Sequence, residues 1–442
     1  MIMSTASTHP ATARRTFRER ALELFPGGSN GEYGLPANLV SVLTRGKGCR
    51  VWDTEGTEYL DMTMAWGAAL VGHARPEVLA AAVEQAARGA NFAAMNDRAV
   101  ELAEQLQRLC PCAERVRLVA SGTEATLLCL RIAHAATNRP KVLRFEGAYH
   151  GQHPVGVAGM IDGRPTPSPH ADPTGAGAPW VERVVLVAPF NDLDATLRIL
   201  SAHADDLAAV IVEPLHRCLV PRPGFLEGLR EATRRHGIVL IFDETVTGFR
   251  LALGGAQAHY GVVPDLAAYG KALGGGFPIG AYAGRADLME IVNEHRLPGP
   301  RYVWSASTSG GNPVSCAAAL ATLKVLAEPG TYERLHASGE GLRTRLRQAL
   351  VRSGEVAQVL GDGPLAQVAF SAQPVTDQRS WLAADRRRAR SLMLALVQGG
   401  VFLNPMGTKL YLSLAHAEAD LDEFADRFAA ALANSRAPLP AS

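Results

Sequence analysis

The sequence predicts an α/β fold in which helices cover both faces of a mostly parallel central sheet, with a smaller α+β domain beside it. Between residues 65 and 315, short apolar runs such as "LAAVIVEP" and "IVLIFDE" alternate with helical patterns such as "FLEGLREATRRHG". Nearly continuous apolar runs are typical of strands that are buried on both faces, as in a parallel sheet. From residue 316 onward, long amphipathic stretches dominate, and two or three strands are expected between them.

The chain of 442 residues is long enough for two or three domains at roughly 100 to 200 residues each. We expect an N-terminal helix and β-meander over residues 1–64, a large α/β domain over 65–315, and an α+β domain over 316–442. The meander surrounds the turn sequences "RGKG" and "DTEG" and is predicted to be part of the small domain.

Charge and composition exclude several classes of partner. Lys plus Arg (44) nearly equals Asp plus Glu (43), and no block of like charge is long enough to bind nucleic acid or a membrane surface. No apolar run approaches the ~20 residues that span a bilayer. Small molecules, or a second copy of the chain, are therefore the expected partners. The six cysteines form no CxxC pair, and without a secretory signal they indicate free, buried thiols in a reducing cytoplasm.

Three short stretches carry the candidate chemistry. In "SGTEA" a predicted strand gives way to a helix, and the backbone amides there, beside Ser121, Gly122 and Thr123, suit a phosphate. Asp243 ends the buried run "IFDE", and ligands of open α/β sheets bind outside the carboxyl ends of strands. Lys271 follows another strand and precedes a run of glycines that lets the backbone approach a ligand closely. Each stretch also has a purely structural explanation. The serine and threonine of "SGTEA" can be helix caps, Asp243 can cap the following helix or turn, and Lys271 can be a solvated surface lysine.

Taken together, these stretches describe a cofactor that carries a phosphate, a protonatable ring nitrogen and an aldehyde. Pyridoxal 5′-phosphate has these groups: the helix start takes the phosphate, Asp243 the ring nitrogen, and Lys271 the aldehyde as a Schiff base. Burial of Lys271 would free its amine as a nucleophile. No metal ion is predicted.

The motifs "SGTEA", "FEGAYHG", "VEP", "IFDETVTGFR", "GKALGGGFPIGAYAG" and "TSGGNP" follow one another along the chain. In this order and at this spacing the sequence resembles the class III pyridoxal-phosphate aminotransferases, from about residue 17 to about residue 430. It is most similar to the branch that contains glutamate-1-semialdehyde 2,1-aminomutase. The resemblance implies an aspartate-aminotransferase-like fold and a homodimer whose active sites lie at the subunit interface.

The resemblance also implies roles for individual residues. Lys271 corresponds to the Schiff-base lysine, Asp243 to the partner of the ring nitrogen, and Ser121 to Thr123 to the phosphate cradle. The remaining positions matched to the cofactor site are Tyr149, which stacks on the ring, His150 beside it, Glu213 as a buttress, and Thr308, which reaches the phosphate of the neighbouring subunit. Trp66 corresponds to a wall of the substrate pocket, although a core tryptophan is an alternative.

The sequence departs from these relatives mainly in the substrate pocket. Thr408 stands where the aminomutases have a glutamate, His216 where many aminotransferases have a glutamine, and Cys218 where the aminomutases have an asparagine. Thr245 replaces a valine, and the arginine that some amino-acid-specific relatives place after the Pro-Gly-Gly turn is absent. The candidate partners for a substrate carboxylate are Arg217, Arg250, Arg301 and Lys409, each of which has a solvated or structural cation as its alternative.

We therefore expect an aminotransferase that moves an amino group from an amine or amino-acid donor to an oxo acceptor through a Lys271 Schiff base. The first alternative is intramolecular transfer of the aminomutase type, and a racemase or a decarboxylase on the same scaffold is another. A pyridoxal-binding regulator would need a nucleic-acid module that the sequence does not contain. A nucleotide-binding enzyme would need GxxxxGK[ST], which is absent.

Overall fold

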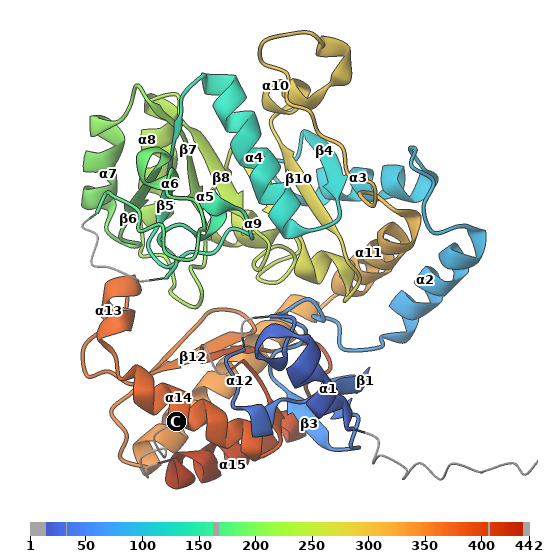
Figure 1. The fold of residues 1–442 in the computed structure, drawn as a ribbon, viewed down its shortest axis with the longest axis vertical. Helices are drawn as coiled ribbons and strands as arrows, with labels where there is room; N and C mark the ends of the chain where they lie inside the picture. Colours follow the sequence, from blue (N-terminus) through green and yellow to red (C-terminus); the bar gives the residue numbers. More distant parts are fainter. Residues whose placement is uncertain (1–14, 32, 162–167, 405–406, 436–442) are drawn as a thin grey trace, which may run out of the picture.

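The computed structural model describes residues 15–31, 33–161, 168–404 and 407–435 (Figure 1). Its largest sheet has seven strands in the order β4-β10-β9-β8-β7-β5-β6. In that order they are Arg115–Val119, Gly280–Gly284, Leu266–Tyr269, Val239–Asp243, Leu207–Val212, Lys141–Phe145 and Val185–Ala188. Only β10 runs against its neighbours, since it pairs antiparallel with both β4 and β9. The predicted mostly parallel sheet is confirmed.

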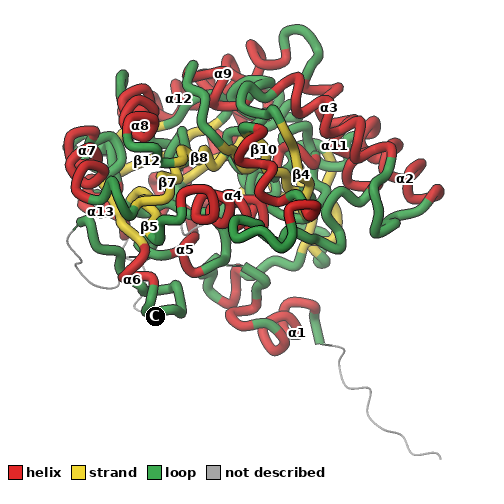
Figure 2. Tube along the Cα trace, turned by 90° about the horizontal axis from the view of Figure 1, so that it is seen from above, coloured by secondary structure: helices red, strands yellow, loops and turns green. Residues whose placement is uncertain are grey.

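Alternating side chains of the strands pack into separate cores on the two faces of this sheet. In β7, Ala209 and Ile211 join the core beneath α4 (Gly122–Thr137), whereas Val210 and Val212 join the core on the opposite face. This second core receives α2 (Pro76–Arg88), α3 (Asp97–Leu109), α7 (Leu193–Ala202), α8 (Phe225–Arg235) and α11 (Pro313–Leu326). Figure 2 shows the strands enclosed between helices. Burial on both faces explains why these strands are continuous apolar runs rather than alternating ones.

The lower lobe in Figure 1, called the small lobe from here on, combines the two ends of the chain, and the upper lobe with the seven-stranded sheet is called the large lobe. The antiparallel strands β1 (Leu43–Lys47), β2 (Arg50–Asp53) and β3 (Glu58–Asp61) form the predicted meander, and β13 (Val401–Phe402) extends it in parallel with β3. A three-stranded antiparallel sheet holds β11 (Gln358–Leu360), β12 (Leu365–Ala369) and β14 (Lys409–Tyr411). These lie against α12 (Thr331–Arg352), α14 (Arg386–Gln398) and α15 (Glu418–Asn434) around one apolar core.

The other elements are short. The α-helices are α1 (Phe17–Leu24), α5 (Pro154–Val157), α6 (Val181–Val184), α9 (Gly255–Tyr260), α10 (Ala286–Met289) and α13 (Gln378–Ala383). The 3₁₀ turns are η1 (Pro26–Gly28), η2 (Ala37–Leu39), η3 (Lys271–Gly274), η4 (Glu290–Val292) and η5 (Glu294–Arg296).

Two features of the organisation bear on the sequence analysis. Four strands rather than two or three follow residue 316, because the two-residue β13 leaves its own region to pair with β3. This pairing links the N-terminal meander to the C-terminal part of the chain, whereas α11 runs across the proposed boundary at 315 and 316. The domain boundaries therefore stay predictions.

The six cysteines are free and buried, as predicted. In the part of the chain that the structure describes, no helix combines the length and apolar character needed to cross a membrane.

Candidate active site

The candidate site lies where the ends of β4, β8 and β9 meet. Asp243 is the last residue of β8, and Lys271 comes two residues after the end of β9. Gly270 and Gly122 pack so closely that a Cβ built on Gly270 would lie 3.5 Å from the backbone nitrogen of Gly122. Thr245 closes the same junction, because a Cβ on Gly122 would lie 2.7 Å from its Cγ2. The three stretches singled out from the sequence therefore come together in space.

The N-terminus of α4 is the anion site that the sequence analysis predicts. The Ser121 hydroxyl accepts a hydrogen bond from the backbone of Glu124 at 3.2 Å, so Ser121 is also the helix cap. Gly151 packs directly on Thr123, with a Cβ built on Gly151 only 2.8 Å from the Thr123 Cα. The amides of the first turn have no partner within an α-helix, and the helix dipole adds to their attraction for a phosphate.

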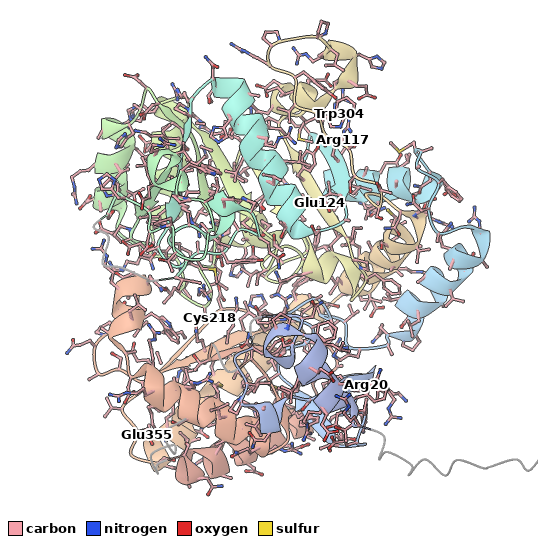
Figure 3. All side chains as sticks on the ribbon, viewed as in Figure 1. Arg20, Arg117, Glu124, Cys218, Trp304 and Glu355 are labelled. Carbon is pink, nitrogen blue, oxygen red and sulfur yellow. The ribbon has the colours of Figure 1, made fainter. Side chains whose placement is uncertain are left out.

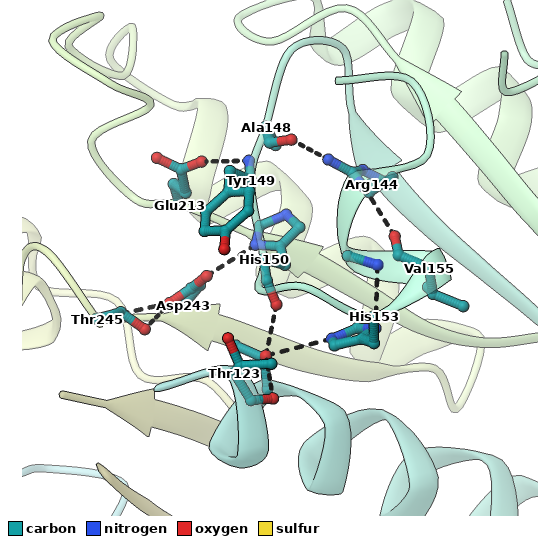
Figure 4. Close-up of polar contacts among 12 residues, drawn as sticks. Thr123, Arg144, Ala148, Tyr149, His150, His153, Val155, Glu213, Asp243 and Thr245 are labelled. Atoms are coloured by element: carbon teal, nitrogen blue, oxygen red, sulfur yellow. Dashed lines mark hydrogen bonds and ion pairs between the residues drawn. The ribbon is translucent and has the colours of Figure 1, made fainter. Parts of the chain in front are cut away.

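Asp243 is held from several directions (Figure 4). Its Oδ2 lies 2.9 Å from Nδ1 of His150, and its Oδ1 accepts hydrogen bonds from the backbone and hydroxyl of Thr245. Asp243 and His150 are 5% and 1% exposed. Because a carboxylate oxygen accepts hydrogen bonds, Nδ1 of His150 is the donor. The other ring nitrogen, Nε2, has no partner among the described residues. The hydroxyl of Thr245 thus helps to fix the carboxylate.

Lys271 begins η3 in a left-handed conformation with a φ of 43°, which costs a non-glycine residue of order 1–3 kcal/mol. Burial lowers the pKa of its amine. Asp243, Glu213 and the Tyr411 phenol act to raise this pKa, whereas the charge of Lys409 acts to lower it further. A lowered pKa increases the share of the neutral, nucleophilic amine, in the direction that the sequence analysis expected.

The loop that carries Tyr149 is fixed by Glu213. The backbone amide of Tyr149 donates to Oε1 of Glu213 at 3.0 Å, and the Tyr149 side chain is 37% exposed. Burial acts to raise the pKa of Glu213, but the nearby His216, His150, Arg217 and Lys409 lower it to about 2. Glu213 therefore supports the loop as a carboxylate.

Arg144 supports the same loop from beneath and was missed in the sequence analysis. Its completely buried guanidinium donates to the carbonyl groups of Val155, at 2.7 Å, and Ala148. Burial lowers the pKa of Arg144 to about 9. A charged residue inside the apolar strand "KVLRF" was the available signal.

Trp66 lies at the end of an unusual turn. Met64, Ala65 and Trp66 all have positive φ, at 45°, 53° and 57°, and Oδ1 of Asp61 accepts the amides of Thr63 and Met64 where the turn begins. The indole is 39% exposed. Its ring centroid lies 5.3 Å from that of Tyr33, which the sequence analysis did not single out.

Arg250 joins this turn to β14. It is completely buried, and its guanidinium donates to the carbonyl groups of Val246 and Gly67. It also lies 5.6 Å from the ring centroid of Tyr411. A side chain at Gly67 would meet both groups, since a Cβ there would lie 2.6 Å from Tyr411 and 2.8 Å from Arg250. Arg250 therefore stabilises the turn by joining it to Val246 and Tyr411.

The loop after Glu213 points its side chains in different directions. His216 is completely buried, stacks on Phe190 at 5.0 Å between centroids, and has no hydrogen-bond partner for either ring nitrogen among the described residues. Burial lowers its pKa to about 4. Cys218 belongs to the apolar core of the small lobe, on the side that faces the large lobe (Figure 3). The guanidinium of Arg217 donates to the Gly147 carbonyl at 3.0 and 2.6 Å. The substrate roles of His216 and Arg217 stay predictions.

Thr408 and Thr308 lie at opposite extremes of burial. Thr408 is 2% exposed, and its hydroxyl donates to the Val368 carbonyl at 2.6 Å, so the hydroxyl is already engaged in the sheet. Thr308 is exposed, while its backbone carbonyl accepts from the Asn91 amide at 2.8 Å. The neighbouring Ser307 donates to Glu124 of α4 at 2.8 Å. The expected contact of Thr308 with a neighbouring subunit stays a prediction.

Comparisons with known proteins agree with this arrangement. A family model described as "Aminotransferase class-III" matches residues 35–432, so the chain belongs to the class III aminotransferases. The glutamate-1-semialdehyde 2,1-aminomutase of Desulforudis audaxviator is 42% identical over 86% of this chain and 87% of its own. An ω-transaminase structure from Sphaerobacter thermophilus is 36% identical with a TM-score of 0.90, covering 97% of this chain and 99% of its own. A glutamate-1-semialdehyde aminomutase structure from Pseudomonas aeruginosa PAO1 is 26% identical with a TM-score of 0.84, covering 95% and 93%.

The enzyme is pyridoxal-phosphate-dependent, and its residues fit that cofactor. The start of α4 offers free amides to the phosphate, and the buried Asp243 carboxylate suits a protonated ring nitrogen. The lowered pKa of Lys271 suits attack on the aldehyde. Gly270 and Gly122 lie in contact with each other, and the Thr245 side chain packs against both.

Proposed function

We propose that this enzyme is an aminotransferase that moves an amino group from an amine or amino-acid donor to a separate oxo acceptor. The observation that carries this choice is the environment of Thr408. At the place where the aminomutase glutamate aligns, this chain has a buried hydroxyl that is bonded to the Val368 carbonyl. The site therefore offers no carboxylate there to retain a deaminated intermediate until its amino group returns.

Structural similarity supports the same choice. The chain is 36% identical to the ω-transaminase of Sphaerobacter thermophilus and 26% identical to the aminomutase of Pseudomonas aeruginosa, with TM-scores of 0.90 and 0.84.

Intramolecular transfer of the aminomutase type is the second candidate. It is supported by the names of the curated relatives, since the Desulforudis and Thermomicrobium roseum aminomutases are 42% and 40% identical to this chain. These names favour the aminomutase more directly than they favour transfer between two substrates. The two candidates share the same cofactor residues and differ only in whether the intermediate is released.

The bound cofactor supplies an electron sink for the carbon that carries the amino group. Lys271, with its lowered pKa, would take the proton from that carbon through Nζ and deliver it to the carbon of the cofactor's former aldehyde, which moves the double bond and leaves the amino group with the cofactor. The carboxylate of Asp243 would hold a proton on the ring nitrogen, and His150 and Thr245 keep that carboxylate in place. Tyr149 would stack on the ring, and such stacking contributes about 0.5–1.5 kcal/mol.

We also propose that the enzyme works as a homodimer with shared active sites in the cytoplasm. Large apolar side chains are exposed around the loop of Thr308: Phe92 (49%), Met95 (80%) and Trp304 (64%), the last of which is labelled in Figure 3. Asn91 connects this surface to Thr308 through its side-chain hydrogen bond. A second copy of the chain would cover these side chains and bring Thr308 to the phosphate of the other site. Sedimentation velocity tests this, and a monomer that is active at working concentration would refute it.

Product analysis with and without a keto acid tests the reaction itself. An amine donor plus pyruvate or 2-oxoglutarate should give stoichiometric transfer, whereas glutamate 1-semialdehyde alone should give little or no 5-aminolevulinate. Efficient conversion of the semialdehyde without an acceptor would establish the aminomutase instead. A racemised or decarboxylated donor without an oxo product would exclude both.

A further inference from the structure

Of the four cations that the sequence offered as partners for a substrate carboxylate, the structure leaves Lys409 as the one inside the site with an uncommitted charge. Arg217 donates twice to the Gly147 carbonyl, and Arg250 is completely buried between Val246 and Gly67. Arg301 is exposed on the segment between η5 and α11. The complete burial of Arg250 closes off even its unbonded Nη1 from a ligand, the guanidinium of Arg217 is engaged by a protein carbonyl group, and Arg301 lies on an exposed segment.

Lys409 is placed by the register of two short strands. In the small-lobe sheet, β14 pairs with β12 so that Lys409 lies opposite Gln367 and Tyr411 lies opposite Leu365. Lys409 and Tyr411 are two residues apart and therefore project from the same face of the strand. The ammonium of Lys409 lies 5.1 Å from the centroid of the Tyr411 ring. The same ring packs on Gly67, directly after Trp66, so Lys409 borders the turn that carries the indole.

The charge of Lys409 acts on several groups around the cofactor residues. After burial, it is among the influences on the pKa of Lys271, Glu213 and His216. Within the described ranges of the chain, the side chain of Lys409 makes no hydrogen bond and no ion pair, and its ammonium contacts only the face of the Tyr411 ring. Glu213, which also acts on the pKa of Lys271 and His216, already accepts the amides of Tyr149 and Arg217.

A partly buried ammonium without a hydrogen-bond or ion-pair partner favours an anion, because desolvation penalises an unpaired charge and a charge-assisted hydrogen bond offsets that penalty. The position on the Tyr411 ring, next to the turn that carries Trp66, restricts the anion to one that enters with the substrate. We propose that Lys409 binds the carboxylate of the substrate, so that the enzyme acts on amino acids and oxo acids in preference to simple amines. The inference rests on the proposed amino-transfer function and names the substrate class of that same site.

Isosteric donors test the inference in the half-reaction, where no second substrate is needed. L-Alanine and isopropylamine differ only by a carboxylate in place of a methyl group, as do β-alanine and propylamine. The change in visible absorption of the holoenzyme reports the reaction of each donor. We expect Lys409→Met to raise the apparent Kd for the carboxylated donors about tenfold or more and to leave the simple amines nearly unchanged. Lys409→Arg should retain most of the preference, and the matched control Lys324→Met, at an exposed lysine of α11, should retain all of it.

A binding measurement without turnover gives an independent readout. Propionate and butyrate carry the carboxylate without an amino group, and calorimetric titration into the holoenzyme should show binding that Lys409→Met weakens about tenfold or more. The corresponding amides, propionamide and butyramide, should not distinguish the variants.

The outcomes separate failure of the inference from failure of the proposed function. Equal losses with carboxylated and simple donors, or unchanged carboxylate binding in Lys409→Met, would overturn the role of Lys409 while the reaction stands. If no donor converts the cofactor of the wild-type enzyme, the proposed function fails, and the calorimetric comparison still decides whether Lys409 binds a carboxylate.

Discussion

Nδ1 of His150 lies 2.9 Å from Oδ2 of Asp243, and both side chains are almost completely buried. Two donors of Thr245 face the other carboxylate oxygen. These donors on both oxygens fix the orientation of the carboxylate that we expect to face the cofactor's ring nitrogen. The pair also joins two distant segments, because His150 follows β5 whereas Asp243 ends β8.

Asp243→Asn should retain the cofactor and lose turnover by several orders of magnitude. A neutral amide does not stabilise the protonated ring by charge, and each ~1.4 kcal/mol of lost transition-state stabilisation lowers the rate about tenfold. Single-turnover absorbance measures the loss. His150→Gln, which keeps a donor near Oδ2, is the graded control and should lose less. Near-normal turnover of Asp243→Asn would show that another acid serves the ring.

Lys271→Ala should abolish the visible absorption of the covalently bound cofactor while the phosphate still binds at the start of α4. Removing Nζ removes both the covalent bond and the group that moves the substrate proton. Spectra before and after dialysis check both parts. Lys324→Ala, a change at an exposed lysine of α11, should leave the spectrum unchanged. A yellow Lys271→Ala protein with wild-type turnover would contradict the assignment.

Gly67→Ala should destabilise the protein by about 1–3 kcal/mol more than a matched change elsewhere, because overpacked contacts cost about this amount. The new Cβ would lie 2.6 Å from Tyr411 and 2.8 Å from the Arg250 guanidinium. Gly224 has the same φ of 84° with no atom within 4 Å of its Cβ position, so Gly224→Ala isolates the backbone strain. Urea unfolding compares the two variants, and equal losses would mean that contacts at Gly67 do not matter.

His416 should make stability depend on pH below neutrality. Nδ1 of His416 accepts the Ser413 amide, and its Nε2 lies 3.2 Å from the Asp61 carbonyl, so the geometry fits the neutral ring. Burial lowers its pKa from 6.5 to about 4. The unfolded chain therefore binds the proton first. The contribution of His416 is complete above pH 6.5 and is lost, at about 1.4 kcal/mol per pH unit, as the pH falls toward 4.

Urea midpoints of the wild type and His416→Gln at pH 7.5, 6 and 5 measure this dependence. The variant should be less stable at pH 7.5 and should lose less stability on acidification. Parallel losses would assign the acid sensitivity to the other buried histidines, His153 and His216, whose pKa values burial also lowers to about 4.

Much of the candidate cofactor site could be predicted because each part of it is a local motif of a few adjacent residues. A Ser-Gly-Thr start of a helix, an acid at the end of an apolar strand, and a lysine beside glycines each have a local physical reason. In an α/β sheet the ends of parallel strands meet at one edge, so the fold class alone brings these parts together. The roles of Arg144 and Tyr411 were missed because burial of a guanidinium beneath a loop and packing on Gly67 depend on segments far apart in the chain.

The sequence by itself determined the class of fold and the identity of the cofactor, and it marked the residues that we expect to hold it, since apolar periodicity and local motifs encode them. Only the tertiary structure decided how the substrate pocket is built. Thr408 and Lys409 are adjacent, yet the Thr408 hydroxyl is bonded to Val368 whereas the Lys409 ammonium lies over the Tyr411 ring. Successive side chains of a strand point to opposite faces, and a shift of one residue in the pairing of β14 with β12 would exchange them. That register is set by packing across the whole small lobe, which no short stretch of sequence contains.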